Sequence, residues 1–208
     1  MGRYTGPKCR LCRREGMKLM LKGERCESAR CSFNKRDYPP GQQAWRRSKF
    51  SAYGIQLREK QRLKRFYNVG ETQFRRYFGE AERQKGNTGE NLLVCLERRV
   101  DNVVARAGMA ASRNQARQLI THGHLEINGR RVTTPSQLVN VGDVIAPRQK
   151  ECTAKIMTQV REAVKGRPVP TWLEVNDEPL QGRMLSLPNR EEVEIPIREQ
   201  LIVELCSK

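Results

Sequence analysis

The chain has 208 residues, of which 40 are Lys or Arg and 23 are Asp or Glu, so its formal net charge is +17. This length suits one large domain or two small ones. The longest uninterrupted apolar run, Leu92 to Leu96, is far shorter than the ~18 residues of a membrane span, and no export signal is recognisable near the start. We therefore expect a cytoplasmic protein that does not cross a membrane.

The positive charge is concentrated in the first three quarters of the sequence. The net charge is +10 over residues 1–50, +5 over 51–100 and +4 over 101–150, whereas residues 151–208 carry −2. A pI near 10.1 at this size is typical of a protein with a polyanionic partner. Eleven of the twelve aromatic residues also lie before residue 79. Basic residues mixed with aromatic ones favour RNA over duplex DNA, because unpaired bases offer faces for stacking.

Four of the seven cysteines form the pattern Cys9-x2-Cys12-x13-Cys26-x4-Cys31. Two such close pairs can direct four thiolates at one point, and a tetrahedral set of four thiolates is the structural arrangement that Zn²⁺ prefers. An iron–sulfur cluster uses the same ligands and is the alternative. We expect basic neighbours to lower the thiol pKa values. Because four protein ligands leave no open position, the metal would fasten an arm that has few aliphatic residues and would catalyse no reaction.

Predominantly helical sequence follows this arm. Residues 37–42 are rich in Pro and predict a linker, and a basic loop comes next. Ser51 predicts the N-cap of a helix that runs to about Tyr67, with Ile55 and two other apolar residues facing the core. Its positions 58, 62 and 65 are all Arg and form a cationic stripe. We interpret this stripe as a phosphate contact, and the alternative is a solvated helix face.

Further helices are predicted over about 71–85 and 90–107, and the phenylalanines of the first two helices are interpreted as core residues. The final segment, Glu199 to Leu205, fits a strand or a helix equally well. The three cysteines outside the arm lie among apolar neighbours and are expected to be buried; they are Cys95, Cys152 and Cys206.

A helix and a hairpin are predicted in the middle of the chain. Ser112 and Gln115 have the spacing of a capping box for a helix that stops near Gly123. Alternating apolar residues around Asn128-Gly129 predict a β-hairpin with a type I′ turn. The Gly142-Asp143 turn suggests another strand pair. An amphipathic helix is expected over 151–165 and short strands over 172–175 and 184–187.

These elements suggest a surface that binds RNA by its shape. The start of a helix attracts anions, and Arg113 would add a phosphate contact there, with Arg117 one turn further along on the same face. Arg130 and Arg131, in the hairpin, would close the other side of a channel for the RNA backbone. His122 is interpreted as structural or as a peripheral RNA contact. The predicted RNA-binding residues are Arg3, Arg13, Arg14, Arg46, Arg47, Lys49, Arg58, Arg62, Arg65, Ser112, Arg113, Asn114, Arg117, His122, Arg130 and Arg131.

Several segments resemble the RNA-binding module named after small-subunit ribosomal protein four. They are Asp101-Asn102-Val103-Val104, Ala110 to Ile120, Gly123-His124, Asn128-Gly129-Arg130-Arg131-Val132, Pro135-Ser136 and Gly142-Asp143. The remaining motifs extend the resemblance to the bacterial small-subunit ribosomal protein four family over essentially the whole chain; they are Met1 to Pro7, the four-cysteine arm, Tyr38-Pro39-Pro40-Gly41-Gln42, Leu57 to Gln61 and Glu199 to Leu205. Retention of all four cysteines is similar to the metal-bearing branch of that family.

The resemblance implies an α+β protein in three parts. They are a metal-binding arm of four cysteines with its linker at 1–44, a helical domain at 45–90 with 181–208, and an inserted RNA-binding module of helices on a small antiparallel sheet at 91–180. It implies a structural constituent of the small ribosomal subunit, which binds small-subunit ribosomal RNA early in assembly. It further implies contact with ribosomal protein five, with an influence on translational accuracy, and a place along the channel by which messenger RNA enters.

Two other classes of protein are weighed against this interpretation. An RNA-modifying enzyme can carry the same module, but no segment is left that is long enough for a catalytic domain, so we expect no enzyme and no small-molecule substrate. A zinc-dependent DNA regulator is motivated by the four cysteines, but no array of recognition helices and no dimerising heptad pattern follows them.

Overall fold

The computed structural model describes residues 4–42, 51–164, 166–193 and 195–207. The chain divides into two units, one made of residues 1–92 with 194–208 and the other of residues 93–193. Among the described residues no helix is both long enough and apolar enough to cross a membrane.

The arm contains three short helices, α1 (Cys9–Glu15), α2 (Glu24–Glu27) and α3 (Ser32–Lys35). Gly16 ends α1 in the left-handed conformation with φ 67°, which a glycine adopts without steric cost. Leu19 and Leu21 are buried after this turn, but the arm offers few other aliphatic side chains for a core.

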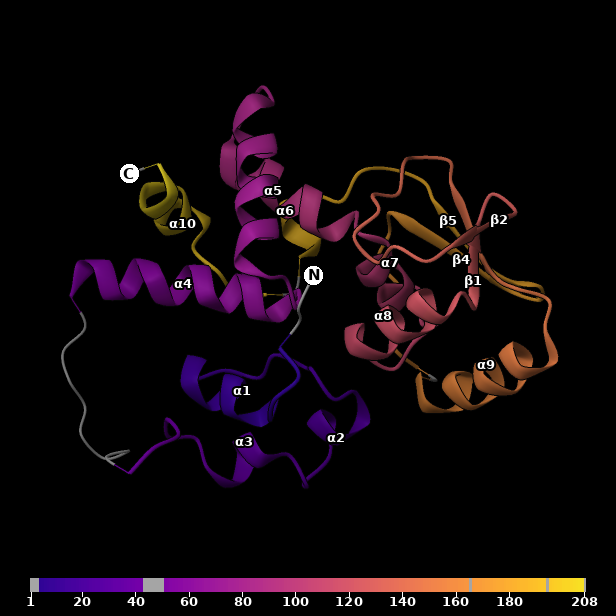
Figure 1. Ribbon diagram of the computed structural model, residues 1–208, viewed down its shortest axis with the longest axis horizontal. Coiled ribbons are helices and arrows are strands. Elements are labelled where there is room, and N and C mark those ends of the chain that lie inside the picture. The colour runs from indigo at the N-terminus through magenta and orange to yellow at the C-terminus, as the bar shows by residue number, and fades with distance from the viewer. Residues whose placement is uncertain (1–3, 43–50, 165, 194, 208) are drawn as a thin grey trace. The chain divides into compact units, whose positions relative to one another are not determined.

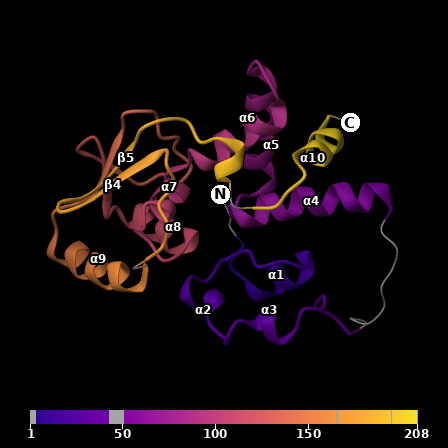
Figure 2. The ribbon, with the colours of Figure 1, turned by 180° about the vertical axis from the view of Figure 1, so that it is seen from behind.

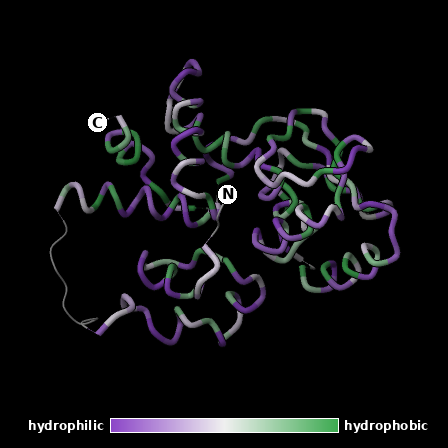
Figure 3. The backbone as a smooth tube through the Cα atoms, in the orientation of Figure 1, coloured by the Kyte–Doolittle hydropathy of each residue, from purple (hydrophilic) through white to green (hydrophobic). Residues whose placement is uncertain are grey.

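Three longer helices lie wholly within the described part of the first unit, namely α4 (Ala52–Phe66), α5 (Glu71–Arg83) and α10 (Glu199–Cys206), and α10 lies alongside α4 (Figures 1 and 2). The predicted cap of α4 is confirmed, because the Ser51 hydroxyl accepts a hydrogen bond from the Gly54 N–H at 3.1 Å. Polar and apolar residues alternate along α4 in Figure 3, as in an amphipathic helix. The segment Glu199 to Leu205, which fits a strand or a helix in the sequence, lies in α10 and is helical.

The phenylalanines of α4 and α5 are buried as predicted, at positions 66, 74 and 78. The inward placement of Ile55 is wrong, because 46% of this residue is exposed. Near that end of α4 the buried face passes through Gln56, whose amide donates a hydrogen bond to Glu204 of α10 at 2.8 Å.

The helix predicted over 90–107 is in fact two helices, α6 (Thr88–Glu97) and α7 (Val100–Arg106). The backbone of Arg99 is extended, and the Val100 N–H donates to the carbonyl of Gln137 at 2.9 Å instead of continuing a helix. The Val139 N–H likewise donates to the carbonyl of Arg98 at 2.8 Å. Pairing with the segment around 137–139 therefore breaks a sequence that locally favours one helix.

The next helix, α8 (Arg113–His122), begins at the predicted cap. The Ser112 hydroxyl accepts from the Gln115 N–H at 3.3 Å, which confirms half of the capping box. Oε1 of the Gln115 side chain accepts from the Ala111 N–H at 2.7 Å, one residue before the N–H that a standard capping box would use. The helix ends at Gly123, where the N–H groups of Gly123 and His124 donate to the Ile120 and Leu119 carbonyls in a Schellman motif.

The second unit contains a five-stranded antiparallel sheet of order β2-β1-β3-β5-β4. Its strands are β1 (Leu125–Ile127), β2 (Arg130–Val132), β3 (Val144–Pro147), β4 (Leu173–Asp177) and β5 (Leu180–Met184). The predicted type I′ hairpin is confirmed, since Asn128 and Gly129 both have positive φ, 49° and 74°. The Gly142-Asp143 turn forms no hairpin of its own, because β3 pairs with β1 and β5.

An apolar core fills the space between this sheet and its helices, α7, α8 and α9 (Glu151–Val164) (Figure 1). Val104, Ile120, Leu125 and Met184 are each at most 1% exposed within it. The predicted boundary at residue 180 is wrong: β5 pairs with both β3 and β4, so residues 181–193, including the 3-10 turn η1 (Arg190–Glu192), belong to the second unit.

The cysteines outside the arm differ in exposure. Cys95 is 1% exposed, in agreement with the prediction. Cys152 lies on the first turn of α9 and is exposed, and Cys206, near the end of α10, is half-buried. The buried face of α9 instead passes through Thr153, Met157 and Val160, so the apolar neighbours of Cys152 did not indicate its burial.

Candidate nucleic-acid interface

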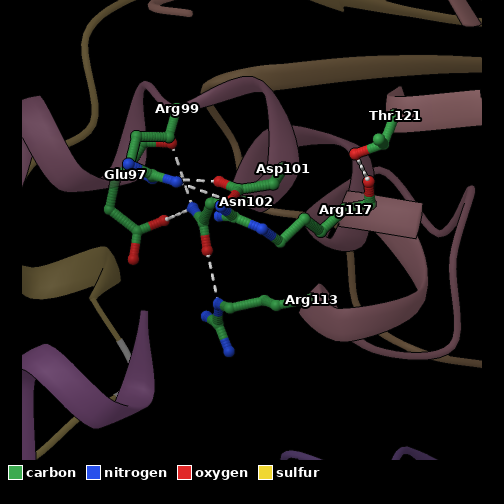
Figure 4. Close-up of polar contacts among 7 residues, drawn as sticks. All are labelled: Glu97, Arg99, Asp101, Asn102, Arg113, Arg117 and Thr121. Atoms are coloured by element: carbon green, nitrogen blue, oxygen red, sulfur yellow. Dashed lines mark hydrogen bonds and ion pairs between the residues drawn. The ribbon is translucent and has the colours of Figure 1, made fainter. Parts of the chain in front are cut away.

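Arg113, on the first turn of α8, is held by the side-chain amide of Asn102 (Figure 4). Its Nε donates to Oδ1 of Asn102 at 2.6 Å. The Asn102 amide nitrogen donates in turn to the backbone carbonyl of Glu97 at 3.0 Å and to the Glu97 carboxylate. Asn102 and Glu97 are each 1% exposed, so they form a fixed support, whereas Arg113 is half-buried. A second cation, Arg106, lies 3.3 Å from the same Glu97 carboxylate.

Arg117, one turn further along α8, is held by a carboxylate. Its Nη1 lies 3.5 Å from Oδ2 of Asp101. The same carboxylate forms a bidentate ion pair with Arg99, whose Nε donates to Oδ1 at 3.0 Å and whose Nη2 donates to Oδ2 at 2.6 Å (Figure 4). The side chains of Arg99 and Asp101 are 2% and 4% exposed, as expected for a buried charge pair with complete hydrogen bonding.

This buried polar network fixes the arginines at the beginning of α8. A guanidinium group that is already oriented loses less conformational entropy when it binds a phosphate. The start of a helix carries partial positive charge, which adds to the attraction for an anion. Reasoning from residue types missed the supporting residues Glu97, Arg99, Asp101 and Asn102. Four adjacent or nearly adjacent polar residues within an otherwise apolar stretch were the available signal.

The hairpin arginines occupy a different place from the one expected. Arg130 and Arg131 are exposed on β2, but Arg131 packs against Gly123, which caps the far end of α8. A helix of 10 residues spans about 15 Å, so Arg131 does not face Arg113 across a channel at the helix start. The cations are therefore distributed along α8, and the two-sided channel is corrected to this arrangement.

The two histidines at the end of α8 have rings 6.1 Å apart. Nδ1 of His124 lies 3.0 Å from the hydroxyl of Thr153, which is fully buried. Burial lowers the pKa of His124, and the nearby His122 and Lys150 lower it further. His122 itself is exposed, so it can reach a ligand from this surface.

The arginines of α4 meet a carboxylate of the arm. Nη1 of Arg58 lies 3.2 Å from Oε1 of Glu15, and Arg65 forms an ion pair with the same oxygen. Arg62 donates to the backbone carbonyl of Glu15 at 3.2 Å and pairs with Glu59. Burial raises the pKa of Glu15, which is 2% exposed, although the surrounding guanidinium groups oppose this effect. Glu15 and Glu59 thus offset part of the positive charge of this stripe, and phosphate contact by the stripe stays a prediction.

The remaining predicted contacts lie in or beside the arm. Arg13 donates to the carbonyl of Tyr38 at 3.0 Å and lies over the Tyr38 ring at 4.9 Å, so it closes the linker onto α1. Arg14 is exposed on the last turn of α1, and Ser112 and Asn114 are half-buried at the start of α8. Four further predicted residues, Arg3, Arg46, Arg47 and Lys49, lie outside the described residues.

All seven cysteines are free thiols, and those of the arm are gathered near one another. Cys12, Cys26 and Cys31 are buried, and Cys9 is half-buried. Burial raises the pKa of Cys12 and of Cys26. The other three cysteines of the arm raise the pKa of Cys12 further, and Cys31 and Cys9 raise that of Cys26, so the expected lowering by basic neighbours is wrong for these two thiols. The Lys22 N–H donates to Sγ of Cys26 at 3.4 Å.

The donor set fits a tetrahedral zinc ion in its chemistry, because it offers four thiols, most of them shielded from water. Within residues 4–42 and the other described ranges, however, no three Cys, His, Asp or Glu side chains are grouped closely enough to hold a metal ion. Zinc therefore stays a prediction, as does the iron–sulfur alternative.

Known proteins match this chain over its whole length. Residues 3–97 match the family described as ribosomal protein S4/S9 N-terminal domain, and residues 98–145 match the S4 domain. Proteins named small ribosomal subunit protein uS4 are 58% identical in Thermoanaerobacter sp. (strain X514), 56% in Caldicellulosiruptor saccharolyticus and 55% in Acetivibrio thermocellus, each over 208 residues and 100% of both chains. Such proteins are structural and are not enzymes, which confirms that expectation. The chain therefore belongs to the ribosomal protein S4 family.

Proposed function

We propose that the chain is a structural constituent of the small ribosomal subunit and binds small-subunit ribosomal RNA through α8. The observation that carries this proposal is the pair Arg113 and Arg117, oriented by buried polar residues at the start of a capped helix. Oriented guanidinium groups suit the phosphates of a folded RNA, whose deep major groove is closed to side chains. The net charge of +17 adds long-range attraction.

The salt dependence of RNA binding tests this proposal. We expect the affinity of the full chain for small-subunit ribosomal RNA to fall steeply with salt. Each lost phosphate contact reduces the slope of log affinity against log salt by roughly 0.7–0.9, so Arg113→Ala with Arg117→Ala should reduce it by about twice that amount. The matched control is Lys155→Ala with Arg161→Ala, which removes the same charge from α9. Equal slopes for the two double variants would contradict a contact at α8.

The chain is further proposed to act early in assembly and to lie in the cytoplasm within the ribosome. The acidic last quarter, with a net charge of −2, suits contact with a protein, for which ribosomal protein five is the proposed partner. A position along the channel of messenger RNA and an influence on translational accuracy follow from the same placement. Co-sedimentation with small subunits through a high-salt wash tests the placement, and cross-linking to ribosomal protein five and to messenger RNA tests the contacts.

We also propose that Cys9, Cys12, Cys26 and Cys31 hold Zn²⁺, which when bound would fasten the arm. The support is the spacing of the thiols, their burial, and an arm with few aliphatic residues. Metal analysis should find one zinc per chain in the wild type and in Cys152→Ala, whose cysteine is exposed and outside the cluster. Cys12→Ala should lose the metal. If the wild type instead contains iron and absorbs visible light, the four cysteines hold an iron–sulfur cluster and not zinc.

Chelation provides a second test of the metal. The second unit has its own apolar core, so we expect a chelator to expose the amides of residues 4–42 to hydrogen exchange and to leave the sheet protected. Unchanged exchange in the arm after the metal has been removed would show that the metal does not fasten it.

A further inference from the structure

Gly123 is buried although it lies between exposed and half-buried residues at the end of α8. What covers it is the guanidinium group of Arg131, which crosses from β2. A Cβ atom on residue 123 would lie 2.6 Å from Nη2 and 2.8 Å from Cζ of Arg131, and closer still to Nε. Any side chain at position 123 would therefore occupy the space that the guanidinium group now fills.

We infer that Gly123 is a positioning residue for RNA binding, because its missing side chain seats Arg131 at the end of α8. The inference rests on the proposed function and extends it to a third cation along one helix. The carbonyl end of a helix carries partial negative charge, so a guanidinium group there is held favourably. With Arg113 on the first turn of α8 and Arg117 one turn further along, the arrangement offers cations along about 15 Å of α8 to the backbone of one RNA strand.

The substitution Gly123→Ala is expected to move Arg131 and to leave the fold in place. The atoms that it would displace belong to the far end of a flexible side chain, which can rotate away more easily than backbone can shift. The substitution also places alanine at φ 71°, where residues with a side chain are strained. The experiment has to separate the effect of this backbone strain from the effect of displacing the guanidinium group of Arg131.

Two further variants make that separation. Gly108 has the same φ of 71°, but a Cβ there would meet only Cγ1 of Val164, at an ordinary 3.5 Å. Gly108→Ala therefore carries comparable strain without displacing an arginine. Gly123→Asn introduces a residue that tolerates the left-handed conformation better than alanine does, yet its Cβ still blocks the seat.

The salt slope of RNA binding is the first readout. We expect Gly123→Ala, Gly123→Asn and Arg131→Ala each to lower the slope by about 0.7–0.9, and Gly108→Ala to leave it unchanged. Combining Gly123→Ala with Arg131→Ala should lower it no further than Arg131→Ala alone. Additive losses, or a wild-type slope in Gly123→Asn, would overturn the inference.

The second readout does not depend on RNA. The Nε–H resonance of Arg131, identified by its loss in Arg131→Ala, should shift in both Gly123 variants of the free protein and stay in place in Gly108→Ala. If the resonance does not move, the seat is refuted whatever the RNA result. The Arg131 resonance could instead shift while Arg113→Ala with Arg117→Ala leaves RNA binding unchanged. The proposed function would then fail. The contact between Gly123 and Arg131 would be structural, without a role in binding, and the inference would also be overturned.

Discussion

Arg58 and Arg65 of α4 contact a different kind of neighbour from Arg113 of α8. On α4, Arg58 and Arg65 converge on the carboxylate of Glu15, a buried residue of the arm. On α8, Arg113 donates to the side-chain amide oxygen of Asn102, which carries no charge, whereas Arg117 lies 3.5 Å from the carboxylate of Asp101, which also pairs with Arg99. A carboxylate partner offsets the positive charge of a guanidinium group, whereas an amide orients the group and leaves the charge in place.

The difference indicates separate roles for two similar surfaces. The α4 arginines compensate a carboxylate that burial would otherwise make costly, so they join the arm to the helix. The arginines of α8 are half-buried like those of α4, so the contrast between the two helices lies in their partners: Arg113 is oriented by a neutral amide, which leaves it suited to an external anion. Basic residues at helical spacing thus contribute to internal cohesion on α4, whereas on α8 we propose that they bind RNA.

The largest expected effect on stability follows from removing the carboxylate of Asp101, which pairs with Arg99 and Arg117. Asp101→Ala would leave Arg99 buried without its charge partner, which should lower the free energy of unfolding by about 3–5 kcal/mol. Urea denaturation followed through the buried Trp172, in a Trp45→Phe background, measures the effect. Asp101→Ala with Arg99→Met removes both charges and should recover much of the loss. A double variant no more stable than Asp101→Ala would show that the charge pair is not the cause.

A smaller loss is expected when the carboxylate of the arm is isolated. Arg58→Ala with Arg65→Ala leaves Glu15 buried without these two charge partners, and we expect a cost of about 2–3 kcal/mol, less than for a fully buried pair because both arginines are partly exposed. Denaturation measures the cost, and adding Glu15→Gln should reduce it. The salt slope of RNA binding, measured on the same double variant, tests the phosphate contact predicted for this stripe, and an unchanged slope would contradict that contact. A slope lowered by about 1.4–1.8 would instead assign these arginines to phosphates.

The two helix caps permit a matched comparison of about 1 kcal/mol each. Ser51→Ala and Ser112→Ala both remove a hydroxyl that accepts a hydrogen bond from the helix, so each should cost about 0.5–2 kcal/mol of stability. Only Ser112→Ala should also weaken RNA binding, because Arg113 is the next residue. Denaturation and RNA titration of both variants test this contrast, which equal RNA affinities would refute.

Local patterns predicted the elements whose causes are local. The Asn128-Gly129 turn and the Ser112 cap depend on residues within four positions, and both are present. The break at Arg99 was missed because its cause, hydrogen bonding to the segment around 137–139, is distant in the sequence. The boundary at residue 180 failed for the same reason, since β5 pairs with β3 across a long interval of sequence.

Sequence patterns indicated the basic residues of the candidate site, but they did not indicate the buried residues that hold them in place. Basic spacing and the capping signal indicated Arg113 and Arg117, but the spacing of residues does not reveal which buried group lies beneath them. Glu15 shows the same limit, because it lies 43 and 50 residues from the arginines that it pairs with. Local sequence thus indicates which face of a helix is charged, and tertiary structure decides what that charge meets.

The smallest expected effect concerns a surface carboxylate of α5 and its dependence on pH. Burial tends to raise the pKa of Glu71, but hydrogen bonds from Lys60 and Lys64, at 2.7 and 2.9 Å, outweigh it and lower the pKa from 4.5 to about 2. A lowered pKa in the folded state means that the carboxylate stabilises the fold above its ordinary pKa, and that this stabilisation is lost as the pH falls through about 2.

Glu71→Gln should therefore cost about 0.2–1 kcal/mol at pH 7, since the pair is partly exposed and screened by solvent. The difference between wild type and variant should shrink between pH 4.5 and 2 and vanish below that range. Denaturation of both proteins across this range measures it, with the exposed Glu82→Gln on the same helix as the control. If the difference in stability between wild type and Glu71→Gln stays constant down to pH 2, Glu71 acts through packing. The ion pairs of Lys60 and Lys64 with Glu71 would then contribute nothing measurable to stability.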